Sequence, residues 1–544
     1  MSSADTTTQT PIEVPPKKPK RPMRELFEGL GIALLMAVFY KYFAIEAYQI
    51  PTSSMQPTMM GSSEAGVYDR LIVDKLRYTM FDPEQWDIAV FKYPIRQNQN
   101  YVKRIVGMPG MRLRFASGNV YEVVDGDGSK PEDLRVCRKP DLLQEHIWKE
   151  VFPARMHVNG GSTILNHYFT GRGGDWSEQD GVLRCAPRSD KARARLSFSN
   201  GDGFVNEVWD GYPVDISRKI RESTGSQPEL QRQVQDARIS FTFTPKQAPD
   251  ELEITIPVDY ERDGRTETVQ FEYRWKADGE TLAINVDQKD VATATPSRRL
   301  AFAPNESHTF RLTHYDDLLR IEIDGDVVAE LECGPHKQLD DPSLVSPNLR
   351  ISGGSEFEIA DLKLERDLHY VASTRLGSTN SMLKVPDPKD VITVPDGHYM
   401  MLGDNTLQSV DSRDWTAITI GVEDGRVVDP TTHPNAKRLS GNLRPTLLSK
   451  DPDPDENPVA VASEGKIVFT DAAGEVWTLD GEVHMAGAEV GQMWGHGAWF
   501  QDEDGKPWHP ETSLVRFVPR EHIIGRPLLN FWPIFHPFRV GLIR

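Results

Sequence analysis

Three short segments of the 544-residue chain contain residue types that can do chemistry. Residues 50–58 are IPTSSMQPT, residues 101–110 are YVKRIVGMPG, and residues 401–413 are MLGDNTLQSVDSR. The first segment places Ser54 between two prolines, where a serine is either a turn residue or a nucleophile. A serine hydroxyl is a weak nucleophile at neutral pH, so catalysis at Ser54 requires a base brought close by the fold.

Each segment taken alone has an ordinary structural explanation. A serine beside proline usually belongs to a turn, and Gly-Asp-Asn is a common turn sequence. The pair Lys103 and Arg104, on a predicted strand, is typical of a solvated sheet edge. Whether the segments form a site therefore depends on the elements that position them.

An apolar stretch precedes the first segment. Residues 1–24 are rich in Ser, Thr, Pro and basic residues and are predicted to be a disordered cytoplasmic tail. Residues 25–47 are predicted to be a transmembrane helix. The twelve uncharged residues between Glu28 and Lys41 are too few alone, but the run continued through Ile45, with Lys41 snorkelling, approaches the ~17 to 20 residues required. A cleaved signal peptide or a buried helix is the alternative, but no small-x-small cleavage site ends the run. Basic residues predict a cytoplasmic N-terminus: Lys17, Lys18, Lys20, Arg21 and Arg24.

Short strands with β-branched residues follow the apolar stretch. VYDRLIVDK at 67–75, DIAVFKY at 87–93 and NYVKRIVG at 100–107 predict a β domain. The closing stretch from residue 515, VRFVPREHIIGRPLLNFWPIF, is also strand-like and needs a partner sheet, which we expect to be the one begun at residue 67. The β core is therefore predicted in three parts, at 48–112, 377–415 and 513–544.

Two further β regions are predicted to interrupt this core. Residues 113–376 form the first insertion, in which alternation such as Ile239, Phe241 and Phe243 and a turn at Asp324-Gly325 indicate a β-sandwich from about 190 to 370. Its pattern resembles concanavalin-like or laminin-G-like jelly rolls. Residues 416–512 are loop-rich, include DPDPDENP, and form the second, smaller β insertion.

Charge and cysteine content exclude some classes of function. A net charge of −19 argues against nucleic-acid binding, which needs clustered Lys and Arg. The cysteines Cys137, Cys185 and Cys333 lack metal-ligand spacing and permit one disulfide at most. The carboxylates Asp316, Asp317, Asp324 and Asp326 could hold Ca²⁺, but an Asp-rich hairpin end is more often solvated. We therefore predict no cofactor and no metal.

In this order and behind an anchor, the segments resemble type I signal peptidases, the membrane-bound serine proteases that remove signal peptides. The resemblance covers about 160 residues and neither insertion. It is carried by EAYQIPTSSMQPT, DIAVFKYP, YVKRIVGMPG, VPDGHYMMLGDNTLQSVDSR and FVPREHIIGR.

The resemblance implies a role for each site residue. Ser54 matches the nucleophile, Lys103 the base, Ser409 the serine that orients the lysine, and Thr52 the hydroxyl that joins the backbone N–H of the nucleophile in the oxyanion hole. At its reference pKa a lysine is neutral in only about one molecule in 2500 at pH 7, so burial must lower the pKa of Lys103.

Other positions carry over with supporting roles. The walls of the substrate pockets correspond to Ile50, Pro51, Met55, Tyr101 and Val102. Structural ion pairs near the site correspond to Arg104, Asp404, Asp411 and Arg413. The family's substrate binds as an added strand, and its small pockets imply small residues at positions −1 and −3.

The sequence also departs from the family pattern. Ser53 stands where many relatives have glycine, and Trp86 precedes DIAVFKYP where glycine is usual. Residues 406–408, TLQ, occupy the middle of the third motif. About 100 residues separate Asp414 from Phe517, although the motifs on either side are normally adjacent in the family. This separation calls into question the local strand pairing, but not the catalytic groups.

These observations predict an active signal peptidase in a bacterial inner membrane. It is expected to cross the membrane once, to place its catalytic domain outside the cytoplasm, and to bind preprotein signal peptides and the lipid bilayer. One alternative is a catalytically idle anchored protein whose sandwich binds an envelope ligand. Another is a self-cleaving Ser-Lys repressor-type protease, which the anchor and the absence of a DNA-binding segment argue against.

Overall fold

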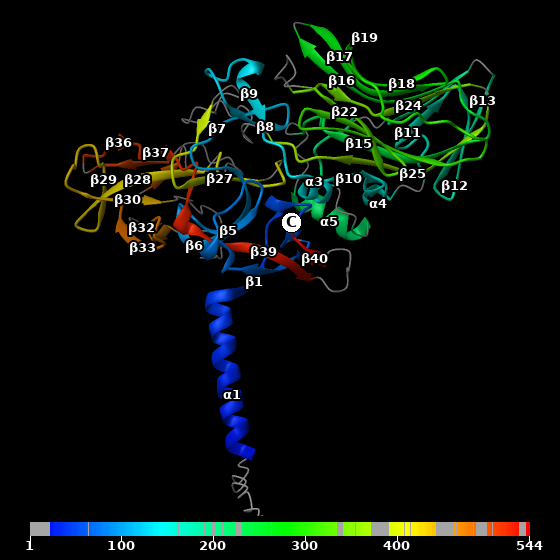
Figure 1. Cartoon of the computed structure of the whole chain (residues 1–544). Coiled ribbons are helices and arrows are strands. Elements are labelled where there is room, and N and C mark those ends of the chain that lie inside the picture. Colours follow the sequence, from blue (N-terminus) through cyan, green and yellow to red (C-terminus); the bar gives the residue numbers. More distant parts are fainter. Residues whose placement is uncertain are drawn as a thin grey trace, which may run out of the picture.

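The computed structural model shows a mainly β protein, with the sandwich on one side of the core and the second insertion on the other (Figure 1). The predicted basic residues from Lys17 to Arg21 and the DPDPDENP stretch lie outside the described residues. The structure describes residues 22–63, 65–160, 163–189, 192–198, 203–208, 212, 214–224, 231–262, 264–333, 341–353, 355–370, 391–406, 409–413, 415–441, 461–463, 466–481, 483–485, 498–502, 504–532 and 540–543.

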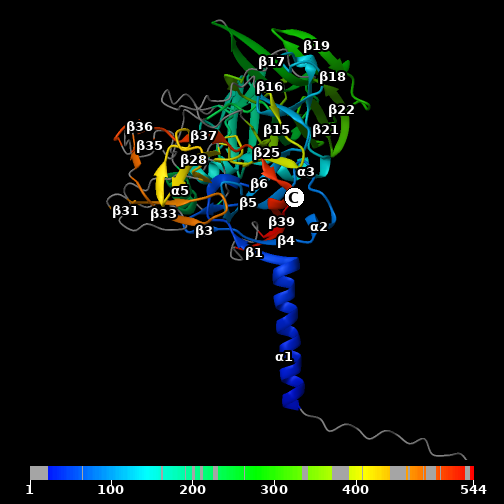
Figure 2. The same ribbon diagram turned by 90° about the vertical axis from the view of Figure 1, so that its left-hand side faces the viewer.

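Helix α1 (Pro22–Phe39) extends away from the rest of the molecule as a rod (Figures 1 and 2). It passes into a π-helical turn, η1 (Tyr40–Ala44), and then directly into strand β1 (Ile45–Gln49). The helix therefore begins earlier than the predicted start at residue 25. It also ends earlier than predicted, because the residues of β1 pair with strand β4 (Arg70–Asp74) instead of continuing the helix. In the part of the chain that the structure describes, no helix has both the length and the hydropathy needed to cross a membrane.

The core sheet has the strand order β1-β4-β39-β5-β6-β27-β38, and all neighbouring strands are antiparallel. Strand β40 pairs with β39, which itself lies between β4 and β5. The prediction that the closing stretch joins the sheet begun at residue 67 is thus confirmed. The strands are β5 (Ile88–Tyr93), β6 (Arg96–Gly107), β27 (His398–Leu402), β38 (Val518–Pro519), β39 (Ile523–Trp532) and β40 (Gly541–Leu542).

Smaller elements complete the core. A sheet of order β26-β7-β8-β9 packs between the core sheet and the sandwich. Its strands are β7 (Arg112–Ala116), β8 (Asn119–Val123), β9 (Leu134–Val136) and β26 (Ile392–Thr393). The short elements are η2 (Ser53–Met55), β2 (Gly61–Ser62), β3 (Val67–Tyr68), α2 (Arg77–Met80), η3 (Pro131–Asp133) and η5 (Arg520–His522).

The predicted sandwich consists of two sheets that share one apolar core. One has the order β12-β13-β25-β15-β20-β21-β22 with β10 beside β25, and the other the order β11-β14-β24-β16-β17-β18-β19 with β23 beside β16. The first sheet comprises β10 (Lys149–Phe152), β12 (Gly174–Gln179), β13 (Val182–Pro187), β15 (Ala237–Pro245), β20 (His308–Tyr315), β21 (Leu318–Ile323), β22 (Asp326–Glu332) and β25 (Phe357–Arg366). The second comprises β11 (Phe169–Arg172), β14 (Arg193–Phe198), β16 (Glu251–Arg262), β17 (Arg265–Lys276), β18 (Gly279–Val286), β19 (Lys289–Ala294), β23 (Leu344–Val345) and β24 (Asn348–Ser352).

The alternating residues face the sandwich core as expected. Ile239, Phe241 and Phe243 are each at most 2% exposed and pack into the shared core. Asp324 and Gly325 have φ angles of 53° and 85°, as a tight two-residue hairpin requires. The sheets also take in β10 to β13, which precede the predicted start near residue 190. Helices α3 (Asp141–Ile147), α4 (Ala154–Asn159) and α5 (Val214–Thr224) lie between the sandwich and the core.

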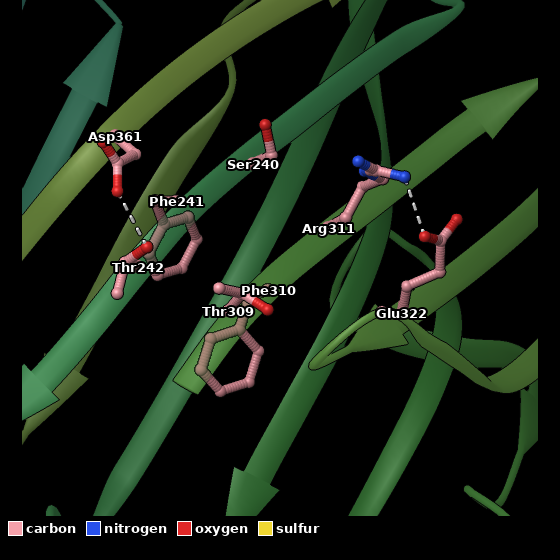
Figure 3. A pocket seen from close by; sticks show the side chains of 9 residues that line it. Ser240, Phe241, Thr242, Thr309, Phe310, Arg311, Glu322 and Asp361 are labelled. Carbon is pink, nitrogen blue, oxygen red and sulfur yellow. Dashed lines mark hydrogen bonds and ion pairs between the residues drawn. The ribbon is translucent and has the colours of Figure 1, made fainter. Parts of the chain in front are cut away.

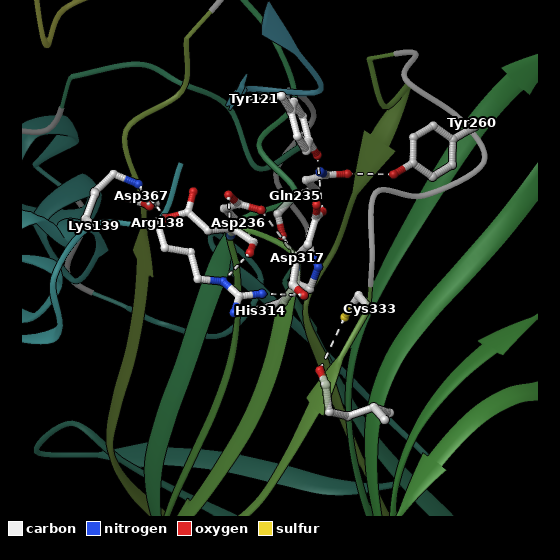
Figure 4. A network of polar contacts seen from close by, with 12 residues as sticks. Tyr121, Arg138, Lys139, Gln235, Asp236, Tyr260, His314, Asp317, Cys333 and Asp367 are labelled. Atoms are coloured by element: carbon white, nitrogen blue, oxygen red, sulfur yellow. Dashed lines mark hydrogen bonds and ion pairs between the residues drawn. The ribbon is translucent and has the colours of Figure 1, made fainter. Parts of the chain in front are cut away.

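A buried polar seam joins the sandwich to the core (Figure 4). The Lys139 ammonium donates hydrogen bonds to Asp316 Oδ2 at 2.9 Å and to Asp367 Oδ2 at 2.7 Å. The Tyr121 hydroxyl on β8 donates to Asp317 Oδ1 at 3.2 Å. Asp316 and Asp317 are therefore buried rather than solvated, because their turn faces the core, whereas Asp324 is exposed at the far hairpin.

The second insertion forms its own small β unit around an apolar cluster. Its main sheet has the order β30-β28-β29-β33-β32-β31, with β37 beside β28, and a further sheet has the order β34-β35-β36. The predicted strands GKIVFTD and EVWTLDG correspond to β32 and β33. The strands are β28 (Thr416–Glu423), β29 (Arg426–Val428), β30 (Lys437–Gly441), β31 (Val461–Ser463), β32 (Lys466–Thr470), β33 (Val476–Asp480), β34 (Val483–Met485), β35 (Ala498–Gln501), β36 (Pro507–Trp508) and β37 (Glu511–Leu514).

Candidate active site

Ser54 lies half-buried in the 3₁₀ turn η2, within a tightly held loop. The Ile50 N–H donates to the Asp69 carbonyl at 2.9 Å, and the buried Asp69 carboxylate accepts from the Met60 N–H at 2.7 Å. A Cβ atom on Gly61 would lie 2.5 Å from the Ile50 carbonyl oxygen, closer than side chains approach. Only glycine fits at position 61, and this close backbone packing fixes the segment that carries Ser54.

Lys103 lies on β6 and is only 2% exposed. Its ammonium donates to Ser409 Oγ at 2.8 Å, across a sequence separation of 306 residues. Burial lowers the pKa of Lys103 to about 8, although the carboxylates of Asp411 and Asp404 act in the opposite direction. At pH 7 such a lysine is neutral in about one molecule in ten, a large gain over an exposed lysine.

Gly403 is the point at which the Ser54 segment meets the Lys103–Ser409 pair. A Cβ atom at this glycine would lie 2.1 Å from Ser409 Oγ and 2.4 Å from the Ser54 carbonyl oxygen. The next residues add direct bonds, because the Asn405 N–H donates to the Ser54 carbonyl at 3.2 Å and the Asn405 amide donates to the Ser53 carbonyl at 3.0 Å. The structure thus brings together the three segments that the sequence singled out.

Two fully buried ion pairs flank this meeting point. Arg104 binds Asp404 through two hydrogen bonds, Nε to Oδ1 at 2.9 Å and Nη2 to Oδ2 at 2.7 Å. Arg413 binds Asp411 in the same way at 2.8 and 2.6 Å, and Asp411 also accepts from the Gly403 N–H. Burial acts to raise the pKa of Asp404, but Arg104 brings it below the usual value. Paired geometry of this kind fixes the backbone of residues 403–405.

The expected pocket walls fall into different environments. Ile50 and Met55 are buried in one apolar cluster, against which Val102 packs. Tyr101 belongs to a neighbouring cluster, where its ring stacks on Tyr93 with centroids 4.3 Å apart. Pro51 and Thr52 are exposed, and Thr52 has extended backbone angles just before η2.

Several residues at the site had not been given roles from the sequence. The Thr58 hydroxyl donates to Asp404 Oδ2 at 2.6 Å, and Asn405 holds the Ser54 segment as described above. Trp86 adopts a φ of 75°, a left-handed conformation in which glycine is favoured, and its carbonyl accepts from Arg104 Nη1 at 2.8 Å. Thr58 and Asn405 lie within the sequence motifs, so the motifs could have pointed to them. For Trp86, the only signal in the sequence was that it stands where the family usually has glycine.

A group of carboxylates in the seam has the spacing of a metal site. One oxygen from each of Asp236, Asp316 and Asp367 lies within 4.8 Å of the others, and all three side chains are buried. The Lys139 ammonium already bonds two of the three. This cluster therefore contains its own cation, and we assign no metal to it.

A separate polar hollow of about 300 Å³ lies on the outer face of the sandwich (Figure 3). Hydroxyls from Ser240, Thr242 and Thr309 line it. Arg311 and Glu322 also line it, and Arg311 Nη1 donates to Glu322 Oε2 at 2.9 Å. These groups can form hydrogen bonds with a polar ligand but include no nucleophile–base pair.

Comparison with known proteins shows a similarity to one protease family. The model of the family "Signal peptidase, peptidase S26" matches residues 23–138 and 339–429. These stretches contain Ser54, Lys103 and Ser409, and the break between them contains most of the sandwich.

Individual relatives agree with this match. Probable signal peptidase I-2 of Synechocystis sp. is 35% identical over 108 residues, which is 19% of this chain and 47% of that protein. Signal peptidase I of Pseudomonas fluorescens is 34% identical over 160 residues, covering 25% of this chain and 54% of that protein. Signal peptidase I of Leptolyngbya laminosa is 34% identical over 125 residues, covering 21% and 58%. The chain thus spans about half the length of these curated relatives.

Solved structures resemble the chain only weakly. A protein of unknown function with a galectin-like fold from Bacillus subtilis matches with a TM-score of 0.27 and 11% identity, covering 41% of this chain and 100% of that one. Both stretches matched by the family model contain segments that meet at Gly403. The first stretch contains Ser54, and the second contains Gly403 itself and Ser409. The chain is therefore similar to signal peptidases of family S26 over these two stretches, and most of the β-sandwich lies in the break between them.

Proposed function

We propose that this protein is a serine endopeptidase that removes N-terminal signal peptides from exported preproteins with a Ser54–Lys103 dyad. The observation that carries the proposal is the buried Lys103 ammonium, hydrogen-bonded to Ser409 and held beside the Ser54 segment through Gly403. A lysine whose pKa is lowered by burial is suited to act as a general base near neutral pH. Ser409 orients the amine, and the two buried ion pairs hold the backbone around it.

In the proposed reaction, neutral Lys103 takes the proton of the Ser54 hydroxyl while Ser54 Oγ attacks the scissile carbonyl carbon. The Ser54 N–H and the Thr52 hydroxyl stabilise the resulting oxyanion, a contribution of about 3 kcal/mol per donor in related sites. Collapse breaks the C–N bond, and protonated Lys103 gives its proton to the departing amine. Lys103 then takes a proton from water, which attacks the Ser54 ester; as the C–O bond to Ser54 breaks, Lys103 returns the proton to Ser54 Oγ and the signal peptide is released.

The substrate is proposed to bind as an extended strand beside the residues that flank the dyad. Ile50, Pro51, Met55, Tyr101 and Val102 are the proposed walls of its pockets. Because Ile50 and Met55 are buried among apolar neighbours, little space remains for large side chains at −1 and −3. A small-x-small cleavage site, of the Ala-x-Ala kind, follows from this arrangement.

We further propose that α1 anchors the protein to a bacterial inner membrane, with the catalytic domain outside the cytoplasm. Supporting this, α1 carries exposed apolar side chains along its length, including Leu26, Leu30, Leu34 and Leu35. Exposed apolar surface of this extent favours a lipid environment over water. We propose that the hollow lined by Ser240 and Arg311 is the binding site for the predicted envelope ligand of the sandwich.

The proposed activity is tested by cleavage of an Ala-x-Ala preprotein by the detergent-solubilised protein. We expect one cut after the −1 alanine, established by sequencing the new N-terminus of the product. A preprotein with a bulky −1 residue, such as leucine, serves as control and should remain intact. A folded protein that cleaves none of several preproteins would rule out the proposed activity.

The rate of cleavage is expected to depend on the protonation of Lys103. Because the neutral amine is the base, kcat/KM should rise with pH through an apparent pKa of about 8. The measurement is a pH profile of initial rates from pH 6 to 10 with a single preprotein. A profile that is flat across this range would remove Lys103 from the role of base.

A further inference from the structure

The inserted region contributes side chains that contact the segment beside the candidate active site. Tyr370 follows β25, at the point where the chain returns from the sandwich to the core, and its N–H donates to the Gly118 carbonyl at 2.8 Å. Its hydroxyl donates to Asp404 Oδ1 at 3.4 Å. Tyr370 is 2% exposed, so this contact is made in the interior of the protein.

A second contact comes from a different part of the insertion. Asn206 is 4% exposed, and its side-chain amide donates to Thr406 Oγ1 at 3.3 Å. Asn206 is itself fixed, because its Oδ1 accepts from the Arg232 N–H at 3.0 Å and its carbonyl accepts from Arg366 Nη2 at 3.2 Å. Residues that adjoin the sandwich strands thus contact both Asp404 and Thr406, on either side of Asn405.

Trp86 connects these contacts to the ion pair of Arg104. Its ring stacks on Tyr370 with centroids 6.1 Å apart, and the Lys139 ammonium lies 5.2 Å from the ring centroid. Its carbonyl accepts from Arg104, which in turn holds Asp404. The seam of Figure 4 therefore continues through Lys139 and Trp86 into the surroundings of the dyad.

Residues 403–405 are the elements that set the relative position of Ser54 and Lys103. Gly403 touches Ser409 Oγ and the Ser54 carbonyl, and Asn405 donates to the Ser54 carbonyl. We therefore expect a shift of Asp404 or Thr406 to move the Ser54 segment relative to the Lys103–Ser409 pair. Small displacements of this kind lower the rate of the chemical step more than they change binding.

We propose that the β-sandwich is a positioning element of the Ser54–Lys103 site and acts on it through Tyr370 and Asn206. This inference rests on the proposed peptidase function and deepens it. Both residues are buried, so we assign them as positioning residues rather than catalytic ones. The sandwich then has a role in catalysis in addition to any role in binding a ligand.

The test compares two buried tyrosines of the seam that each donate to a buried aspartate. Tyr370→Phe keeps the ring stacked on Trp86 and removes only the hydroxyl that reaches Asp404. We expect kcat for the preprotein to fall about fivefold, with KM changed less than twofold, because one hydrogen bond to a charged group is lost from the site. Without the Tyr370 hydroxyl, the Asp404 carboxylate loses one hydrogen-bond donor and raises the pKa of Lys103 more strongly. The acid limb of the pH profile should therefore move to higher pH.

Tyr121→Phe is the matched control, because it removes the hydroxyl that reaches Asp317, away from the dyad. It should leave kcat and the pH profile unchanged, with a melting temperature similar to that of Tyr370→Phe. Asn206→Ala is the second variant and should show the same loss of kcat at constant KM. Equal kinetics for wild type, Tyr370→Phe and Asn206→Ala would overturn the inference. A wild-type protein without any cleavage would instead overturn the proposed function itself.

Discussion

Ser54→Ala is expected to abolish preprotein cleavage, lowering kcat by at least about a thousandfold, while the protein remains folded. The variant removes the Oγ atom that forms the acyl-enzyme in the proposed mechanism, and removal of a serine nucleophile typically costs about 10⁴ to 10⁶ in rate. The fold should tolerate the change, because the observed bonds to residue 54 use its backbone carbonyl. The measurement is single-turnover cleavage of an Ala-x-Ala preprotein, with the melting temperature recorded for both proteins.

Ser53→Ala provides a control that differs by one position. Ser53 also lies half-buried in η2, and its carbonyl, rather than its hydroxyl, accepts the bond from Asn405. We expect this variant to keep most of the wild-type rate. If Ser53→Ala loses activity and Ser54→Ala retains it, the nucleophile is Ser53.

Lys103→Met is expected to abolish cleavage and, at pH 7, to make the protein more stable. Methionine keeps an unbranched side chain of similar size and removes the proposed base. In the folded protein burial lowers the pKa of Lys103 from 10.5 to about 8, which corresponds to roughly 3 kcal/mol of lost stability wherever the lysine is charged. Losing the bond to Ser409 offsets about 1 kcal/mol, so we expect a net gain of about 2 kcal/mol.

Because the pKa of Lys103 is lower in the folded protein than in the unfolded chain, the free energy of unfolding of the wild type depends on pH. Between pH 8 and 10.5 the unfolded chain holds the Lys103 proton more tightly than the folded protein, so wild-type stability rises with pH. The variant lacks this rise, and its advantage should disappear as the pH approaches 10.5. Denaturant unfolding at pH 7 and pH 10 measures both quantities.

Lys92→Met is the control, because Lys92 is an exposed lysine on the neighbouring strand β5. It should alter neither the rate nor the pH dependence of stability. A Lys103→Met protein that cleaves at near wild-type rate would require a different base. A variant much less stable at pH 7 would mean that the buried ammonium is well compensated.

The sequence was sufficient for the core strands and for the segments that meet at Gly403, because both depend on local patterns. Strand alternation placed Ile239 and Phe241 inside the sandwich, and motif order singled out Lys103 and Ser409. The roles of these residues in catalysis remain predictions. Their proximity to one another, however, is a property of the fold that the structure supplies.

Other features depend on contacts between distant residues and could not be predicted from local patterns. Asp316 and Asp317 resemble a solvated hairpin end, but the seam buries them against Lys139 and Tyr121. Tyr370 and Asn206 lie outside all motifs, and only the docking of the sandwich brings them to residues 404–406. The early end of the helix at Ala44 follows from the pairing of β1 with β4, which hydropathy does not encode.

The place of β39 in the core sheet has a consequence for the order of assembly. Strands β1 and β4 enclose the Ser54 segment, while β5 and β6 form a hairpin that carries Lys103, and β39 is the strand that joins β4 to β5. During synthesis residues 523–532 emerge more than 400 residues after Lys103, so the sheet stays open until they arrive. If Ser54 and Lys103 act as proposed, a nascent chain holds both residues before the strand that joins their two parts of the sheet has been made, and we expect proteolytic competence to follow the arrival of β39.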